Sequence, residues 1–159
     1  MKQLRLENSA IFPIEYPATG EHCFFNLYNC NRKQLDDISL AERFSKCLVE
    51  DLGFTDIGTM SYKFNPQGVT HSRLLSQSHL NLHTWPELGT LLGDIFACGN
   101  PINRQTLAAS LRDTFGVAPE IVYYKRGRNS ALSPTASSTL PPIEQCQTCV
   151  AQHALHSHI

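Results

Sequence analysis

The sequence predicts an α+β domain in which an antiparallel β-sheet carries two helices on one face. Two stretches place apolar residues at helical spacing between capping signals, and several others alternate apolar and polar residues as strands do. The chain has 159 residues, 42% of them hydrophobic, which suits one domain with a hydrophobic core. These three observations favour a single folded domain.

Alternating side chains indicate where the strands lie. Residues 22–30 alternate as a strand does, and residues 56–64 alternate with Tyr62 and Phe64 on one face. Further strands are expected at about 68–83, 88–97 and 119–125. Combined with the helices, these strands give the α+β arrangement.

Capping signals define the two helices. The first helix begins at a capping box formed by Ser39 and Glu42 and ends before Gly53, which suits the C′ position. Its apolar stripe consists of Ala41, Phe44, Leu48 and Leu52. The second helix has Asn100 as its N-cap and Pro101 in its first turn. Its apolar stripe consists of Ala108, Leu111 and Phe115, and the helix is expected to end at Gly116.

Both ends of the chain differ in composition from the middle. Residues 1–19 contain two prolines and no sustained periodicity, so we expect an N-terminal extension before a domain at 20–128. Residues 129–159 are rich in Ser, Thr, Pro and Ala, a composition that buries too little apolar surface to offset the entropy of ordering. We therefore expect a disordered tail.

The tail contains potential zinc ligands. Cys146 and Cys149 are followed by His153, His156 and His158, and thiolate and imidazole groups both suit zinc. However, there is only one cysteine pair, and the histidine spacing matches no common zinc finger. We therefore expect no bound metal.

Charge and hydropathy disfavour two classes of partner. The formal net charge is -1 and the Lys and Arg residues are scattered, which is not typical of nucleic-acid-binding proteins. No apolar run is long enough to cross a bilayer, and the N-terminus lacks the apolar core of a signal peptide. We expect a cytoplasmic protein without a membrane partner. Its six cysteines would stay reduced in that compartment, so no disulfide framework is expected.

The most informative run extends from Ser76 to Glu87 and reads Ser-Gln-Ser-His-Leu-Asn-Leu-His-Thr-Trp-Pro-Glu. It closely resembles the self-cleavage segment of bacterial and archaeal S-adenosylmethionine decarboxylases. Other family motifs follow in order: Gly-Glu-His at 20–22, Leu-Tyr-Asn-Cys at 27–30, Phe-Asn-Pro-Gln-Gly-Val-Thr at 64–70, Asp-Ile-Phe-Ala-Cys-Gly at 94–99 and Arg-Gly-Arg at 126–128. Ordered matches over roughly two thirds of a chain rarely arise by chance.

The resemblance implies a precursor that cleaves itself between Gln77 and Ser78. The Ser78 hydroxyl would attack the Gln77 carbonyl, and the resulting ester would break by β-elimination to leave a pyruvoyl group. His83 resembles the family histidine that removes the Cα proton in this elimination, and Thr70 stands where the family has a serine that assists the acyl shift. A continuous strand would put Ser78 and His83 on opposite faces, so we expect a bend or a neighbouring strand to bring them together.

The resemblance also implies the fold, a homodimer and the residues that act after cleavage. The pyruvoyl ketone from Ser78 would form a Schiff base with the substrate amine and accept the electrons of the Cα carbanion. Cys98 resembles the cysteine that returns a proton to Cα after carbon dioxide leaves. Phe64 resembles the aromatic residue that stacks on the substrate's adenine, and Trp85 and Glu87 belong to the segment that lines the pocket.

Three positions depart from the family pattern. Asn26 and Gln77 stand where acidic residues are usual, which weakens attraction for a cationic substrate. His71 stands where glycine is usual, and its side chain is expected beside the cleavage site, where it could obstruct the substrate. S-adenosylmethionine, which would supply the aminopropyl donor for polyamine synthesis, is the favoured substrate, and arginine and ornithine are alternatives. An uncleaved, inactive relative that regulates a partner subunit is a third hypothesis, which is disfavoured because the chain retains Ser78, His83, Cys98 and a hydroxyl at Thr70.

Overall fold

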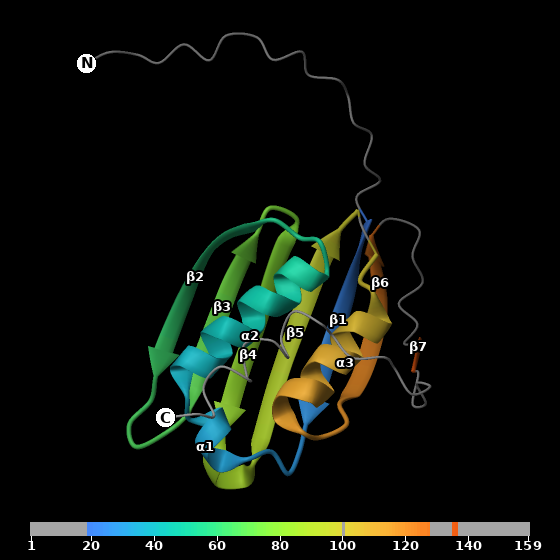
Figure 1. Cartoon of the computed structure of the whole chain (residues 1–159). Coiled ribbons are helices and arrows are strands. Elements are labelled where there is room, and N and C mark those ends of the chain that lie inside the picture. The colour runs from blue at the N-terminus through green and yellow to red at the C-terminus, as the bar shows by residue number, and fades with distance from the viewer. Residues whose placement is uncertain (1–18, 100, 128–134, 137–159) are drawn as a thin grey trace, which may run out of the picture.

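A computed structural model describes residues 19–99, 101–127 and 135–136. Seven antiparallel strands form one sheet in the order β2-β3-β4-β5-β1-β6-β7 (Figure 1). The strands are β1 (Thr19–Leu27), β2 (Asp56–Lys63), β3 (Val69–Leu75), β4 (Ser78–Trp85), β5 (Thr90–Cys98), β6 (Glu120–Gly127) and β7 (Thr135–Ala136). The predicted antiparallel sheet is confirmed. The N-terminal extension up to residue 18 and the tail cysteines and histidines lie outside the described residues.

The strand predicted at 68–83 is wrong, because β3 and β4 form a hairpin in that region. Ser76 and Gln77 make its two-residue turn, and Leu75 lies opposite Ser78. Such turns usually contain Gly, Asn or Asp, and their absence here hid the reversal from a prediction based on alternation. The peptide bond predicted to be cleaved therefore lies at the tip of a hairpin.

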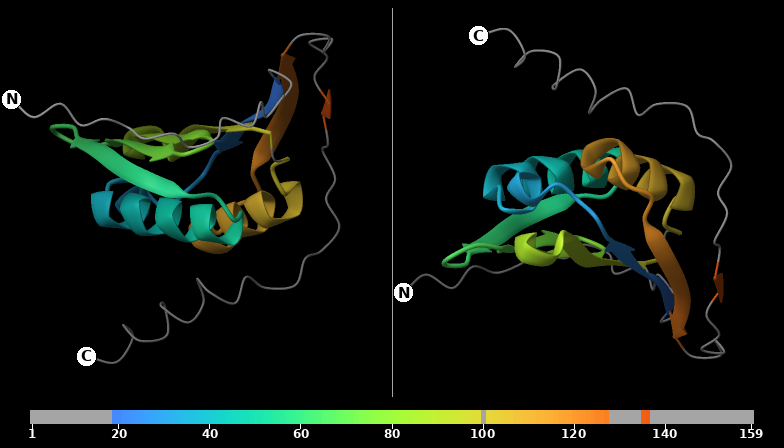
Figure 2. Two further views of the ribbon diagram at one scale, coloured as in Figure 1. Left: turned by 90° about the horizontal axis from the view of Figure 1, so that it is seen from above. Right: turned by 90° about the horizontal axis from the view of Figure 1, so that it is seen from below.

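The two long helices are α2 (Ile38–Asp51) and α3 (Arg104–Phe115), and both cover the same face of the sheet (Figure 2). The predicted layer arrangement is confirmed. Two short elements complete the fold, the helical turn α1 (Arg32–Leu35) and the 3-10 turn η1 (Pro86–Leu88). No helix in the described part of the chain is long and apolar enough to cross a membrane.

Both predicted N-caps are displaced by neighbouring residues. Asp37 caps α2, since its carboxylate accepts hydrogen bonds from the backbone N–H groups of Ser39 and Leu40 at 2.9 and 3.2 Å. Asn103, and not Asn100, caps α3. Ser, Asp and Asn are about equally strong caps, so local composition alone did not select Asp37 over Ser39 or Asn103 over Asn100. The predicted stop of the second helix is confirmed, because Gly116 adopts a φ of 73°.

The two faces of the sheet differ in burial. Side chains between the sheet and the helices form the core, including the fully buried Phe25, Leu80 and Ile95 of the sheet and Leu48 and Leu111 of the helices. The opposite face, which we call the open face, carries large apolar side chains from β1, β2, β3 and β4. Phe24, Met60, Tyr62, Leu74 and Trp85 are 42%, 78%, 62%, 57% and 38% exposed. Exposed apolar surface of this kind marks a site of interaction or binding.

Candidate active site

The bond between Gln77 and Ser78 is held against the end of β5. The Gln77 carbonyl accepts a hydrogen bond from the backbone N–H of Cys98 at 3.0 Å. Ser78 has a φ of 156°, a conformation that is uncommon for residues other than glycine. Backbone strain of this kind costs about 1–3 kcal/mol and concentrates at functional sites. The hairpin thus presents a polarised carbonyl beside a serine with a strained backbone.

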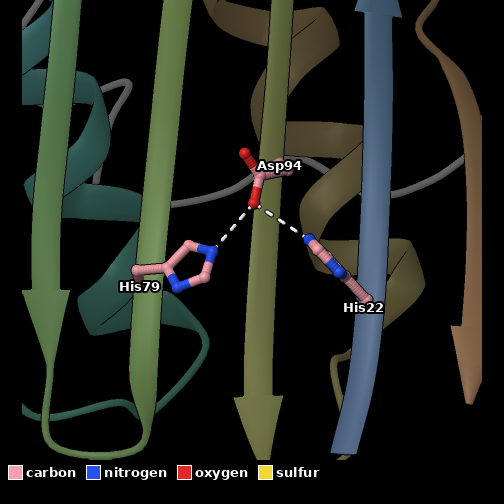
Figure 3. A group of neighbouring side chains, drawn as sticks. All are labelled: His22, His79 and Asp94. Carbon is pink, nitrogen blue, oxygen red and sulfur yellow. Dashed lines mark hydrogen bonds and ion pairs between the residues drawn. The ribbon is translucent and has the colours of Figure 1, made fainter. Parts of the chain in front are cut away.

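The Ser78 hydroxyl also contacts a network of polar side chains on the open face. His79 places Nδ1 3.2 Å from Ser78 Oγ and Nε2 2.9 Å from Asp94 Oδ2. His22 places its Nε2 3.0 Å from the same carboxylate oxygen, so the two imidazoles converge on Asp94 from β4 and β1 (Figure 3). The Asn81 amide donates to the other oxygen, Oδ1, at 3.2 Å.

The Asp94 carboxylate is ionised in this network. Partial burial raises the pKa of Asp94, but hydrogen bonds from His22, Asn81 and His79 outweigh burial and leave the pKa below its ordinary value. An ionised carboxylate accepts hydrogen bonds and donates none. The imidazole nitrogens that face Asp94 therefore carry the protons.

Potential metal ligands gather at this network. Within the described residues, His22, His79 and Asp94 place one ligand atom each within 4.8 Å of one another. The Arg126 guanidinium, which can only donate, lies 3.3 Å from His22 Nδ1, so His22 carries its proton on the nitrogen that faces Asp94. The hydrogen bonds among His22, His79 and Asp94 explain why these side chains lie together, and we assign no metal to them.

A second group lies farther along the same strand. Thr70 and His83 are paired across β3 and β4, with Thr70 Oγ1 3.1 Å from His83 Nδ1. The register of β4 is unbroken, and at roughly 3.3 Å per residue His83 lies about 16 Å from Ser78. Neither a bend nor a neighbouring strand brings these two residues together within one chain.

The predicted substrate-binding residues lie at the far end of β4. Trp85 is its last residue, and Glu87 in η1 accepts a hydrogen bond from the Gln67 side chain at 3.2 Å. Phe64 follows β2, is 47% exposed and packs edge-on against Tyr62 with ring centroids 4.9 Å apart. The site residues predicted from the sequence therefore form three groups along one sheet. They are the cleavage group (Gln77, Ser78 and Cys98), the Thr70–His83 pair, and the aromatic group (Phe64 and Trp85, with Glu87).

The expectation that His71 lies beside the cleavage site is wrong. His71 is completely buried on the helix-facing side of β3, where its ring nitrogens lie 2.6 Å from Ser45 Oγ and 2.8 Å from Ser61 Oγ. Side chains alternate along a strand, so when Thr70 faces the open side the next residue faces the core. Burial, and then the charge of Arg73, lower the pKa of His71. His71 therefore does not obstruct a substrate on the open face.

The other two departures occupy different places. Asn26 is partly buried on β1, between the buried residues Phe25 and Leu27, and so belongs to the open face. The Gln77 side chain accepts a hydrogen bond from the Thr55 backbone N–H at 3.3 Å. Gln77 is thus oriented toward the segment between α2 and β2.

Cys98 differs from the other described cysteines. It ends β5 directly after Ala97, the register partner of Ser78, and it is exposed. Cys23, Cys30 and Cys47 are buried, and all four thiols are free. Only Cys98 among these four is placed to react with a molecule at the cleavage group.

The family model for S-adenosylmethionine decarboxylase matches residues 21–127. An S-adenosylmethionine decarboxylase proenzyme of Methanococcus aeolicus is 36% identical over 109 residues, which cover 68% of this chain and 93% of the relative. Its counterpart in Methanococcus maripaludis strain C7 is 41% identical over 83 residues, 52% of this chain and 68% of the relative. The crystal structure of the adenosylmethionine decarboxylase from Aquifex aeolicus VF5 has a TM-score of 0.65 and 25% identity, covering 74% of this chain and 98% of that chain. The chain belongs to the S-adenosylmethionine decarboxylase family.

Proposed function

We propose that this chain is the proenzyme of a pyruvoyl-dependent S-adenosylmethionine decarboxylase that cleaves itself between Gln77 and Ser78. The main supporting observation is the 3.0 Å hydrogen bond from the Cys98 backbone N–H to the Gln77 carbonyl, next to the Ser78 hydroxyl. Relatives with 36% and 41% identity carry the name proenzyme, which agrees with a maturation step. In this proposal the cytoplasmic enzyme supplies the aminopropyl donor for spermidine synthesis.

Cleavage would begin when Ser78 Oγ attacks the carbonyl carbon of Gln77. Negative charge then develops on the carbonyl oxygen, and a backbone donor already in place stabilises that charge without reorganisation. Breaking the peptide bond also releases the backbone strain at Ser78. The hairpin tip therefore favours both the attack and the departure of the amide nitrogen.

Position 78 suits the pyruvoyl group because it combines the serine source with an exposed thiol on the adjacent strand. When formed, the group supplies the electron sink that decarboxylation of an amino acid requires. Cys98 would hold the proton that Cα receives afterwards.

We further propose that the active site is shared between two copies of the chain. His83 and Thr70 cannot reach Ser78 along a straight strand. The open face, which carries both of them and the His79 ring that contacts Ser78 Oγ, exposes large apolar side chains. In a two-fold interface each contact occurs twice with the roles of the copies exchanged. Packing two open faces about an axis near Asn81 would place His83 of each copy over Ser78 of the other. The aromatic group of each copy would then extend past the other's cleavage group.

Co-expression of Ser78→Ala and His83→Ala chains tests this arrangement. Each variant alone should remain uncleaved, because each lacks one half of every processing site. In the mixed dimer the intact Ser78 of one chain meets the intact His83 of the other, so the His83→Ala chain should be cleaved. Mass spectrometry with tags of different mass identifies which chain is cut. An uncut His83→Ala chain in the mixed dimer would show that the site is not shared.

S-adenosylmethionine is the proposed substrate, with arginine and ornithine as alternatives. The burial of His71 removes one of the three reasons to doubt the nucleoside substrate. The exposed ring of Phe64 supports adenine stacking, and an aromatic face also attracts a sulfonium cation by about 0.5–2 kcal/mol.

Turnover measurements on the matured enzyme distinguish these substrates. We expect kcat/KM for S-adenosylmethionine to exceed the values for arginine and ornithine by at least roughly 10²-fold, since the free amino acids lack the stacking group and the sulfonium. Phe64→Ala should lower kcat/KM for S-adenosylmethionine, while Leu88→Ala, which removes another exposed apolar side chain, should not. Faster decarboxylation of a free amino acid, unaffected by Phe64→Ala, would assign the enzyme to that substrate.

A further inference from the structure

We infer that His79 is the general base and acid of the first cleavage step, and that Asp94 positions it. The inference rests on the proposed function, because it assigns residues to the self-cleavage reaction. His79 contacts the attacking oxygen in the uncleaved chain: its Nδ1 lies 3.2 Å from Ser78 Oγ. Its Nε2 lies 2.9 Å from Asp94 Oδ2, which completes a serine–histidine–aspartate relay. This relay belongs to one chain, whereas His83 lies about 16 Å from Ser78 along β4.

The chemistry of Asp94 decides which atom donates in each hydrogen bond of His79. Because ionised Asp94 can only accept, neutral His79 carries its proton on Nε2 and has a lone pair on Nδ1. The Ser78 hydroxyl is therefore the donor in its contact with Nδ1. This tautomer is the one that general-base catalysis requires, with the base already within reach of the proton it takes.

One imidazole can carry the proton through the whole acyl shift. As Ser78 Oγ bonds to the Gln77 carbonyl carbon, the hydroxyl proton moves to His79 Nδ1. When the bond from that carbon to the Ser78 nitrogen breaks, the proton passes from Nδ1 to the departing nitrogen. The product is an ester with a free amine on residue 78, and no proton is gained or lost overall. His79 is adjacent to Ser78 in sequence, which keeps its ring close to both atoms.

Asp94 is held rigidly enough to orient the ring. Its Oδ2 also accepts from His22 at 3.0 Å, and Asn81 donates to Oδ1 at 3.2 Å. The guanidinium of Arg126 in turn fixes His22 and lies 5.1 Å from the centroid of the Phe96 ring. Figure 3 shows the two imidazoles on either side of the Asp94 carboxylate. Asp94 does not touch Ser78 in this arrangement, so its role is to position His79 and to stabilise its protonated form.

Ester formation can be measured separately from β-elimination. Precursor is produced by cell-free translation, and cleavage is followed by mass spectrometry with and without hydroxylamine, a nucleophile that splits esters but leaves peptide bonds intact. His79→Ala should form the ester roughly 10²- to 10⁴-fold more slowly, so hydroxylamine should release no fragments on the wild-type time scale. His83→Ala should accumulate the ester, and hydroxylamine should then cut it into two fragments. Added imidazole should restore cleavage to His79→Ala, which a loss of structure would not allow.

Two further variants test the positioning role. Asp94→Asn should slow ester formation and Asp94→Glu should recover part of the loss, since only the latter keeps a negative charge beside His79. His22→Asn removes an imidazole from Asp94 but no atom near Ser78, so its effect should be smaller than that of His79→Ala. Wild-type cleavage of His79→Ala, or a hydroxylamine-sensitive ester formed by that variant on the wild-type time scale, would overturn the inference. Wild-type chain that never cleaves would instead contradict the proposed function.

Discussion

Replacing Ser78 with alanine is expected to leave the chain at full length and to abolish decarboxylation. Alanine lacks the oxygen that attacks the Gln77 carbonyl, and without that attack no ketone forms at position 78. Gel electrophoresis should show one band where the wild-type protein gives two fragments, and release of carbon dioxide should fall to background.

Ser76→Ala is the matched control for this prediction. Ser76 is exposed at the same hairpin turn, and its backbone N–H, which alanine retains, donates to the Thr55 carbonyl at 3.0 Å. This variant should cleave and turn over as the wild type does. Fragments of wild-type size from Ser78→Ala would show that the cut does not need the Ser78 hydroxyl, which contradicts self-cleavage by this serine.

Replacing Cys98 with alanine should separate maturation from turnover. The Gln77 carbonyl is held by the backbone N–H of residue 98, which alanine keeps, so the variant should still cleave at or near the wild-type rate. The thiol that returns a proton to Cα is lost, and kcat should fall by roughly 10²-fold or more, as for other general acids. Single-turnover assays on the fully processed variant measure the effect.

Cys47→Ala provides the comparison, because it removes a thiol from α2 on the helix-covered side of the sheet. Its turnover should match that of the wild type. A processed Cys98→Ala enzyme with undiminished turnover would exclude the thiol as the proton donor, while failure to cleave would give the side chain a role in maturation.

Local patterns predicted much of the fold. The 3.6-residue spacing of Phe44, Leu48 and Ala41 placed the first helix, and alternation placed most strands within a few residues. The hairpin turn at Ser76 and Gln77 was missed because turn formation there depends on pairing across the sheet rather than on turn residues. The caps were misplaced for a different reason, because each helix has two suitable capping residues close together in the sequence.

The site was only partly accessible from the sequence. The family motifs identified Ser78, His83 and Cys98, but the separation of His83 from Ser78 requires the register of β4. Ser78 and His83 come from the run at 76–87 and Cys98 from the run at 94–99. His79 lies inside the first of these runs and Asp94 in the second, and the network that joins them spans three strands. The only indication of a role for His79 in the sequence was its position next to the nucleophile Ser78. The role of His79 depends on its hydrogen bond to the Asp94 carboxylate, which lies 15 residues away and whose proximity the sequence spacing does not reveal.

The intact mass of the purified wild-type protein shows whether the chain cleaves itself. We expect two fragments, one of residues 1–77 ending in a carboxylate at Gln77 and one beginning with a pyruvoyl group at position 78. The second fragment should lack a free N-terminal amine and should react with a carbonyl reagent such as phenylhydrazine. A single full-length mass, unchanged after prolonged incubation, would contradict self-cleavage and with it the assignment of this chain as a pyruvoyl decarboxylase.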